Sequence, residues 1–408
     1  MLRAQDASRE IALLDDARKR DLLYAMADAI EEATDTVVAA NGADLTRGRE
    51  TGLSVALQDR LTLDAVRVAA LAAAVREVAE LSDPVGRVLE QRTLDNGLEL
   101  TKISVPFGVV GSIYEARPNV TVDIAALALR SGNSVVLRGG TAAEQTNAAL
   151  VAAMRDALST SGVDPEAIQT LDAFGRDGAK ELMQARGIVD VLVPRGSAQL
   201  IETVVTESSV PVIETGAGVV HVYLDETAPI ERSRDIVVNA KAQRPSVCNA
   251  AETVLVHAAA ADRIVGPVVA ALQEAGVTVH GDETVARLAP DVVPADESDW
   301  ATEYLSLDIA MRVVEDLDEA LGHIRRYSTH HTESIITDDA DSIERFLAEV
   351  DSAVVMANAS TRFTDGGEFG FGAEVGISTQ KLHARGPMGL RELTSTKWVV
   401  RGAGQVRG

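Results

Sequence analysis

Two stretches of the chain alternate short apolar runs with amphipathic runs, and this alternation constrains the fold more than any other feature. The first stretch covers residues 105–240 and the second about 250–372. Residues 105–113 are almost continuously apolar, as is typical of a strand buried on both faces of a parallel sheet. Strand-length runs that alternate with runs of helical spacing predict βαβ units. We therefore expect an α/β protein with two doubly wound parallel sheets.

The expected elements of each stretch can be placed by residue number. In the first stretch we expect strands at 105–113, 134–137, 168–171, 189–193 and 210–213, and helices at 120–130, 142–160 and 198–208. In the second we expect strands at 252–256, 277–280, 307–314, 334–336 and 353–356, and helices at 258–275, 318–327 and 342–349.

The chain begins differently, with helical spacing of apolar residues over 6–82 and Asp64 placed to cap a helix. Two alternating segments follow, 87–94 and 98–103, separated by Asn96-Gly97. Asn-Gly supplies the positive φ values of a tight hairpin turn. Because a two-stranded hairpin is not stable alone in water, it must pair with another part of this chain or with another subunit. Residues 394–401 read as one further strand.

Composition excludes several classes of function. The net charge of −24 argues against nucleic acid as a partner. A single cysteine excludes an internal disulfide and a multi-cysteine zinc site, and the seven histidines show no metal-ligand spacing, so we expect no metal. The first residues lack the apolar core of a signal peptide, and no apolar run is long enough to span a membrane. We expect a cytoplasmic protein.

The one cysteine, Cys248, lies on a predicted loop after Pro245. A thiolate nucleophile needs nearby positive charge or N–H donors, and Lys241, Arg244 and Asn249 are close in sequence. A buried structural cysteine is the alternative. The polar surroundings are a poor core and favour a functional thiol.

Two glycine-containing loops after predicted strands suit a dinucleotide, although the chain has no GxGxxG motif. They contain Arg138, Gly139 and Gly140, and Arg195, Gly196 and Ser197, the latter opening a helix whose start favours phosphate. No acidic residue follows the strand at 134–137, and Arg138 favours the 2′-phosphate of NADP over the ribose diol of NAD.

Other polar residues follow strands or fill glycine-rich loops. Glu214 follows the strand at 210–213 and is either a general base or an ordinary loop carboxylate. The loops at 363–374 and 381–389 would place Arg362, Lys381, His383 and Arg385 where they could meet an anion. Ordinary surface loops are the alternative.

Six segments together resemble the gamma-glutamyl phosphate reductase family of the aldehyde dehydrogenase superfamily. The resemblance extends from about residue 14 to residue 398, and its most specific segments are 111–123 (GSIYEARPNVTVD), 136–140 (VLRGG), 239–249 (NAKAQRPSVCN), 303–308 (EYLSLD), 358–367 (NASTRFTDGG) and 378–389 (STQKLHARGPMG). It implies an aldehyde dehydrogenase-like fold: an NADP-binding domain at 1–86 and 105–240, a catalytic domain at 241–375, and a small β oligomerisation domain formed by 87–104 and 389–408.

The resemblance also implies a reaction and its residues. NADPH would reduce L-glutamyl 5-phosphate to L-glutamate 5-semialdehyde through a thioester on Cys248, as the second step of proline biosynthesis from glutamate. Cys248, Asn249 and Asn119 would stabilise the oxyanion. Glu303 would contact the nicotinamide ribose of the cofactor. The loops at Arg138–Gly140 and Arg195–Ser197 would also bind the cofactor. Arg117, Arg244 and Arg362 would pair with the anionic substrate. A homodimer or homotetramer is implied, with glutamate 5-kinase as a candidate functional partner.

Two other functions fit parts of the sequence. An ordinary aldehyde dehydrogenase would oxidise an aldehyde to an acid, and Glu214 supports it because thioester hydrolysis needs a base-activated water. A non-catalytic scaffold on the same fold is the other rival, against which Cys248, Arg138 and Glu303 count.

Overall fold

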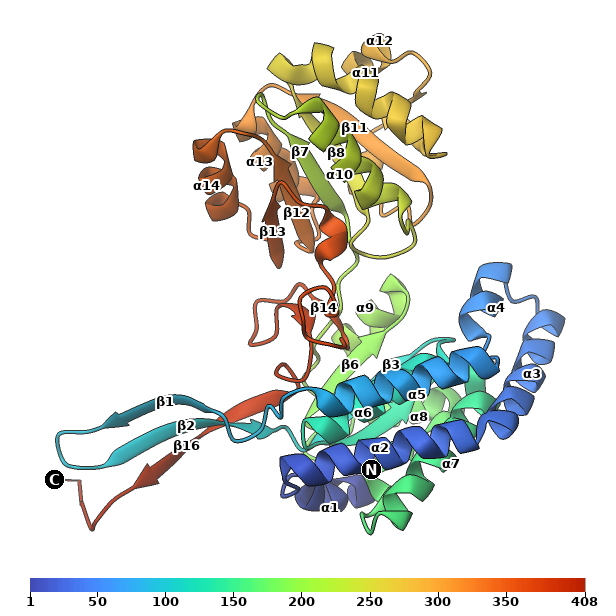
Figure 1. The fold of residues 1–408 in the computed structure, drawn as a ribbon, viewed down its shortest axis with the longest axis vertical. Helices are drawn as coiled ribbons and strands as arrows, with labels where there is room; N and C mark the ends of the chain where they lie inside the picture. Colours follow the sequence, from blue (N-terminus) through green and yellow to red (C-terminus); the bar gives the residue numbers. More distant parts are fainter. Residues whose placement is uncertain (408) are drawn as a thin grey trace. The chain divides into compact units, whose positions relative to one another are not determined.

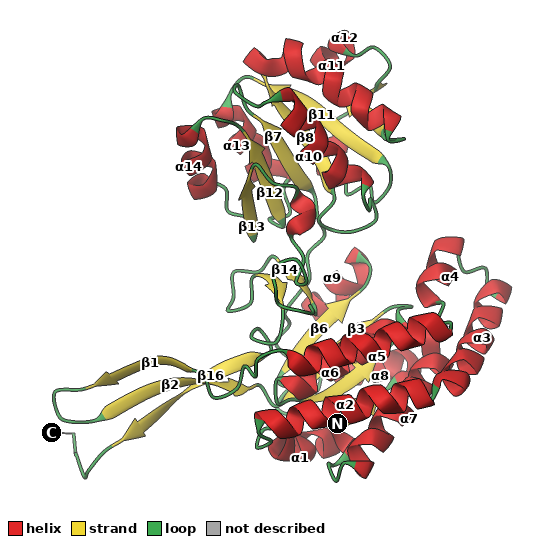
Figure 2. Ribbon diagram, viewed as in Figure 1, coloured by secondary structure: helices red, strands yellow, loops and turns green. Residues whose placement is uncertain are grey.

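The computed structural model describes residues 1–407, which fold into two compact units (Figures 1 and 2). Unit 1 consists of residues 1–215, 370–376 and the chain from 388 onward, and unit 2 of residues 216–369 and 377–387. The chain therefore passes between the units four times. Both units combine parallel sheets with helices, as the α/β prediction required.

The main sheet of unit 1 has four parallel strands in the order β5-β4-β3-β6. They are β3 (Val109–Tyr114), β4 (Ser134–Arg138), β5 (Ile168–Thr170) and β6 (Val191–Arg195). The helices that follow are α6 (Pro118–Arg130), α7 (Glu144–Thr160), α8 (Gly175–Met183) and α9 (Ala198–Glu207). Every residue of β3 is buried, which explains its nearly continuous apolar sequence.

Five helices precede this sheet: α1 (Leu2–Ile11), α2 (Asp16–Glu32), α3 (Thr34–Glu50), α4 (Val55–Leu61) and α5 (Ala65–Glu80). Leu22, Met26 and Ile30 of α2 are fully or almost fully buried, as their helical spacing predicted. The carboxylate of Asp64 accepts the backbone N–H of Arg67, so the predicted cap of α5 is confirmed.

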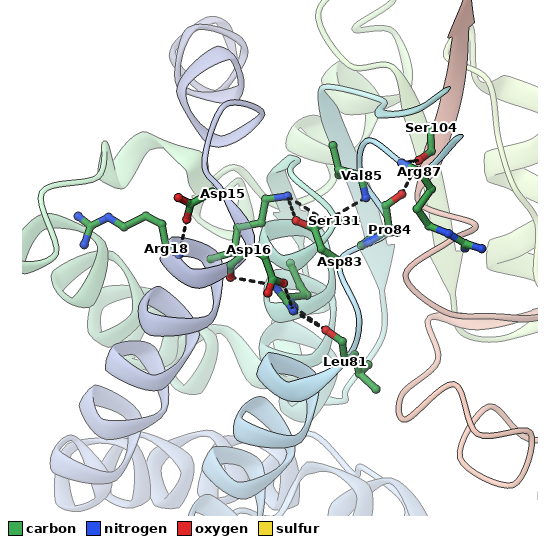
Figure 3. A network of polar contacts seen from close by, with 12 residues as sticks. Asp15, Asp16, Arg18, Leu81, Asp83, Pro84, Val85, Arg87, Ser104 and Ser131 are labelled. Atoms are coloured by element: carbon green, nitrogen blue, oxygen red, sulfur yellow. Dashed lines mark hydrogen bonds and ion pairs between the residues drawn. The ribbon is translucent and has the colours of Figure 1, made fainter. Parts of the chain in front are cut away.

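A polar network fixes the linker between α5 and the hairpin (Figure 3). The buried Lys19 ammonium donates to Asp83 Oδ2 at 2.8 Å, and Asp83 Oδ1 accepts the N–H of Val85 at 2.9 Å. The buried Arg130 guanidinium donates to Asp16 Oδ1 at 2.6 Å and also to the carbonyl of Leu81. Lys19 and Arg130 thus donate hydrogen bonds to carboxylate and backbone acceptors in and around the linker that follows α5.

The predicted hairpin is β1 (Val88–Thr93) and β2 (Glu99–Pro106), and β2 also pairs with β16 (Thr394–Arg401). The three antiparallel strands have the order β1-β2-β16, so the tail supplies the partner that the hairpin needed. The turn differs from the prediction, because Gly97 has φ +85° and Asn96 does not have positive φ. Gly97 donates its N–H to Leu94, which gives a longer turn than a two-residue one. Gly408, the end of the predicted oligomerisation segment, lies outside the described residues.

The sheet of unit 2 has seven parallel strands in the order β10-β9-β11-β8-β7-β12-β13. They are β7 (Val220–Leu224), β8 (Ala251–His257), β9 (Thr278–Gly281), β10 (Val293–Pro294), β11 (Asp308–Val314), β12 (Thr332–Ile336) and β13 (Val354–Ala357). Its helices are α10 (Ile230–Ala242), α11 (Ala258–Glu274), α12 (Glu283–Leu288), α13 (Leu317–Tyr327) and α14 (Ala340–Glu349). Two short strands, β14 (Gly376–Ser378) and β15 (Gly386–Met388), pair where the chain crosses between units.

Alternate residues of the central strands pack on opposite helical layers. Val222 and Val254 lie in one core with α10 and α11. Tyr223 and Leu255 lie in the other, with α13 and α14. Helices thus cover both faces, which confirms a doubly wound sheet.

Several details differ from the sequence-based expectation, and α8, α10, α12 and β10 are elements that it did not include. The strand expected at 210–213 is reduced to one bridge between Leu192 and Val212, because Pro211 has no N–H to donate. β7 was not expected at all. Because β7 and α10 pack within unit 2, the boundary expected at 240/241 lies at 215/216. None of the helices in residues 1–407 is both long and apolar enough to cross a bilayer.

Candidate active site

Cys248 lies in unit 2 on the loop between α10 and β8, as predicted, and is half-buried. The next residue, Asn249, anchors this loop. Its side-chain amide donates to the carbonyl of Thr364 at 2.8 Å, and its own carbonyl accepts the hydroxyl of Thr361 at 2.7 Å. Its side-chain oxygen is buried and has no hydrogen-bond partner within residues 1–407. These two hydrogen bonds therefore fix the cysteine loop to residues 361–364. The side-chain oxygen of Asn249 remains a buried acceptor without a donor.

Gly218 brings Glu303 next to the cysteine loop. A Cβ on Gly218 would lie 1.6 Å from the carbonyl oxygen of Cys248, so only glycine permits this approach of two backbones. The N–H of Gly218 donates to Glu303 Oε1 at 2.6 Å. Burial raises the pKa of Glu303, while the Gly218 N–H and the charge of Lys241 oppose the rise. Two predicted site residues, 55 positions apart, thus meet through one glycine.

Two of the predicted substrate arginines also lie in this part of unit 2. Arg362 is half-buried, and its Nε donates to Gln243 Oε1 at 2.8 Å. Burial lowers the pKa of the Arg362 guanidinium; Asp365 opposes this, and Arg244 and Cys248 also act on it electrostatically. The bond to Gln243 thus holds Arg362 against the loop that carries Arg244 and Cys248.

Lys241 does not face the thiol as the sequence implied. It is fully buried and forms an ion pair with the fully buried Glu252 of β8 at 2.5 Å. Burial lowers the pKa of Lys241 and raises that of Glu252, and each partner's charge opposes the shift of the other. Sequence reasoning missed Glu252. The signal was a single carboxylate in a strand with few other polar residues, which needs a partner when buried.

The predicted cofactor loop at the end of β4 lies in unit 1. Gly139 donates its N–H to the carboxylate of Asp172 at 2.6 Å, and a Cβ on it would lie 2.2 Å from the amide nitrogen of Asn147. Gly139 is thus required by packing inside the protein. Arg138 donates from Nε to the carbonyl of Gly175 at 3.2 Å, which fixes the direction of its side chain. Asp172 and Asn147 were not predicted, since they are distant in sequence.

The second predicted loop is already occupied by a carboxylate. Ser197 caps α9 with its hydroxyl, and its N–H donates to Glu115 Oε2 at 2.9 Å. Gly196 is equally close, since a Cβ on it would lie 2.6 Å from that oxygen. A phosphate at this helix start would have to displace Glu115, because both anions favour the same N–H groups.

The remaining predicted residues of unit 1 lie at the start of α6. Arg117 occupies the cap position before Pro118, and exposed Asn119 donates to Asp123 Oδ2 at 3.1 Å. Burial raises the pKa of Asp123 to about 6, against the opposing effects of Asn119 and Arg195. Glu214 is half-buried in the same unit.

The loop at 381–389, which was expected to bind an anion, forms ion pairs with a carboxylate of the protein itself. Lys381 forms an ion pair with Asp351, and Arg385 donates to Asp351 Oδ1 at 2.8 Å. Lys381 and then Arg385 lower the pKa of Asp351 to about 2. Across residues 1–407, no cluster of three or more His, Cys, Asp or Glu side chains could hold a metal ion.

Comparisons with known proteins show the family to which the chain belongs. The model of the aldehyde dehydrogenase family matches residues 1–305. A gamma-glutamyl phosphate reductase of Clavibacter michiganensis is 64% identical over 405 residues, which cover 99% of this chain and 94% of that protein. The chain belongs to the gamma-glutamyl phosphate reductases of the aldehyde dehydrogenase family.

Other members and neighbours extend the comparison. A gamma-glutamyl phosphate reductase of Thermobifida fusca is 58% identical over 405 residues, which cover 99% of this chain and 97% of that protein. The crystal structure of the gamma-glutamyl phosphate reductase of Thermotoga maritima matches with a TM-score of 0.98 at 43% identity, covering 100% of this chain and 98% of that one. An engineered glycolyl-CoA reductase with bound NADP+ shares the fold, with a TM-score of 0.66 at 17% identity, over 98% of this chain and 95% of that one. The predicted family and fold class are confirmed.

Proposed function

We propose that the chain reduces L-glutamyl 5-phosphate to L-glutamate 5-semialdehyde and phosphate with NADPH, the second step of proline biosynthesis from glutamate. The observation that carries the proposal is the setting of Cys248, whose loop is anchored through Asn249, touches Gly218 beside Glu303, and has Arg244 and Arg362 nearby. The full-length relatives bear the name of this reductase.

The covalent chemistry belongs to the thiolate of Cys248. Its sulfur attacks the acyl carbon, so that a C–S bond forms while the C–O bond to phosphate breaks and phosphate leaves with that electron pair. NADPH, when bound, supplies the hydride that reduces the thioester carbon. The oxyanion then reforms a carbonyl, the C–S bond breaks, and the aldehyde leaves while the thiolate is restored.

Hydrogen-bond donors must stabilise the negative oxygen in both steps. The backbone N–H of Cys248 and the amide of Asn249 are the proposed donors in unit 2, and Asn119 is proposed in unit 1. The bond from Asn249 to Thr364 fixes the plane of its amide, which supports a preorganised role.

A nicotinamide cofactor accords with the family, and we propose NADP(H) in particular. Arg138, Gly139 and Gly140 are the proposed adenosine-side residues, since Arg138 ends β4 with no carboxylate directly after it to read a ribose diol. Glu303, whose carboxylate is held by Gly218, is the proposed ribose contact on the nicotinamide side. Arg195, Gly196 and Ser197 remain proposed contacts, on condition that Glu115 moves off the helix start.

The substrate carries a phosphate at one end and a carboxylate at the other. Arg244 and Arg362 in unit 2, and Arg117 in unit 1, are the proposed cations that pair with these groups. Gln243 supports the assignment of Arg362, because it takes up only the Nε–H of that guanidinium.

Replacing Cys248 with Ala tests the proposal. We expect turnover to be abolished while the thermal midpoint and NADPH binding, followed by fluorescence titration, stay at wild-type values. Turnover that survives in Cys248→Ala would rule out the thioester.

Oxidation of an aldehyde to an acid is the second candidate, because Glu214 could activate water for thioester hydrolysis. Under our proposal Glu214→Gln keeps its phosphate-dependent turnover. Under the alternative, the same variant loses aldehyde oxidation altogether.

Three further assignments belong to the proposal. The exposed apolar face of the β1-β2-β16 sheet supports a homo-oligomer, either a dimer or a tetramer. Glutamate 5-kinase is the proposed functional partner, because its acyl-phosphate product is labile. The cytoplasm is the proposed compartment, since a sequence with a single cysteine suits reducing conditions.

A further inference from the structure

The buried Lys241–Glu252 ion pair joins the two ends of the cysteine loop. Lys241 lies in the last turn of α10 and Glu252 is the second residue of β8, so the pair closes the base of the segment that carries Cys248. Neither side chain is exposed to solvent. The two residues are 11 positions apart, so their ion pair links the two ends of a single loop.

The same pair also holds the segment that carries Glu303. The second carboxylate oxygen of Glu252 accepts the N–H of Leu305 at 3.3 Å, and Lys241 Nζ lies 5.8 Å from the centre of the Tyr304 ring. Leu305 has φ +55°, a left-handed conformation that side chains other than glycine rarely adopt. The Glu252 bond therefore helps to hold a backbone turn that is unfavourable by itself.

These contacts form a closed ring. Glu303, two residues before Leu305, accepts the N–H of Gly218, and Gly218 lies against the carbonyl of Cys248. Lys241 acts electrostatically on both Glu252 and Glu303. If the Lys241–Glu252 pair moved, the cysteine loop would move with it and the thiol would be displaced. The turn at 303–305 would also move, and the carboxylate of Glu303 would be displaced.

We propose that Lys241 and Glu252 are positioning residues for the reaction, whose ion pair fixes the geometry of Cys248 relative to Glu303. The inference rests on the proposed function. Stability alone does not account for the pair, because an apolar pair of similar volume often matches or exceeds a buried ion pair. What a neutral pair cannot reproduce is a short, directed contact that holds both segments at once.

The test compares three variants with wild-type protein. Lys241→Met leaves a buried carboxylate without its cation and should fold poorly. The double variant Lys241→Met/Glu252→Gln removes both charges and keeps an amide oxygen for the Leu305 N–H, so it should fold. Lys19→Met is the matched control, since Lys19 is an equally buried lysine that pairs with Asp83 in unit 1.

In the folded double variant we expect kcat to fall about 100-fold and the KM for NADPH to rise about tenfold, because small displacements of reacting groups are costly. Alkylation of Cys248 by iodoacetamide should also slow. Lys19→Met should lower the thermal midpoint and leave kcat, KM and the alkylation rate of the folded protein unchanged.

Two outcomes would overturn the inference. One is a folded double variant whose kcat and KM stay within about twofold of wild type, below the effect expected of misplaced groups. The other is a Lys19→Met protein with equal changes in KM and alkylation, since these would then follow from lost stability. Failure of wild-type protein itself to reduce the acyl phosphate would instead refute the proposed function, and the alkylation rates would still report on the loop.

Discussion

At the scale of single residues, Gly218 is the most sensitive position of the cysteine loop. A methyl group there would lie 1.6 Å from the Cys248 carbonyl oxygen, and both groups are backbone-fixed, so the loop itself must move. We predict that Gly218→Ala lowers kcat by on the order of 100-fold and changes the alkylation rate of Cys248. Steady-state kinetics and iodoacetamide labelling measure both effects.

Gly322→Ala is the control for that substitution. Gly322 lies exposed in α13 with nothing within 4 Å of an added Cβ, so the change should stabilise the protein by about 0.5–1 kcal/mol and leave kcat unaltered. Wild-type kcat in Gly218→Ala would show that the contact with Cys248 has no bearing on the reaction.

His331 gives a prediction about pH. It is fully buried, and burial lowers its pKa from 6.5 to about 4. The folded state therefore keeps His331 neutral where the unfolded state binds a proton, so stability present above pH 6.5 is lost as the pH falls towards 4. This difference in pKa between the two states corresponds to about 3 kcal/mol of stability. In His331→Gln the urea midpoint should fall less steeply over this range.

The adjacent His330 provides the comparison, because it is exposed. His330→Gln should keep the wild-type slope between pH 6.5 and pH 4. An unchanged slope in His331→Gln would contradict the argument from burial. The sequence alone does not show which of these two adjacent histidines is buried.

Residue chemistry was predictable where one residue type stands out. The single cysteine, and arginines beside it in sequence or motif, could be named without a structure, and one of them, Arg362, bonds to Gln243 in the cysteine loop. Glu252 and Asp172 could not be named, because each owes its importance to partners that folding brings near.

At the scale of elements, the β1-β2-β16 sheet carries a prediction about assembly. Strands β1 and β16 are largely exposed, and Trp398 and Val400, which share one face of β16, are 44% and 54% exposed. An apolar surface of this kind is typical of an interface. We predict that Trp398→Asp lowers the molecular mass measured by sedimentation equilibrium.

Ser395→Asp is the matched change, since strand residues an odd number apart point to opposite faces and it adds the same charge. It should leave the mass unaltered. If both variants and the wild type sediment as one species of equal mass, this face does not hold subunits together.

Strand patterns were predicted well where backbone pairing is regular. The tail strand 394–401 was placed with its observed bounds, while Pro211 broke the strand expected at 210–213. β7 was missed because its short apolar run follows the glycine-rich segment 215–218, which reads as loop. Local sequence cannot show that such a run lies in the middle of a sheet.

At the scale of the whole molecule, the family and fold class could be named from motifs spread along the chain. The domain boundary could not, because the chain crosses between units four times and β7 with α10 joins the unit that follows. Units that share several crossings have no composition-marked linker to reveal them.

The central claim is that the acyl group is bound to Cys248 as a thioester. In the direction of aldehyde oxidation, this thioester is released only by phosphate. The most direct test mixes the enzyme with NADP and glutamate 5-semialdehyde in the absence of phosphate and follows NADPH by absorbance. We predict a single burst equal to the amount of enzyme, then no further turnover until phosphate is added, and no burst from Cys248→Ala. Sustained NADPH formation without phosphate would contradict the account, because water would then be releasing the acyl group.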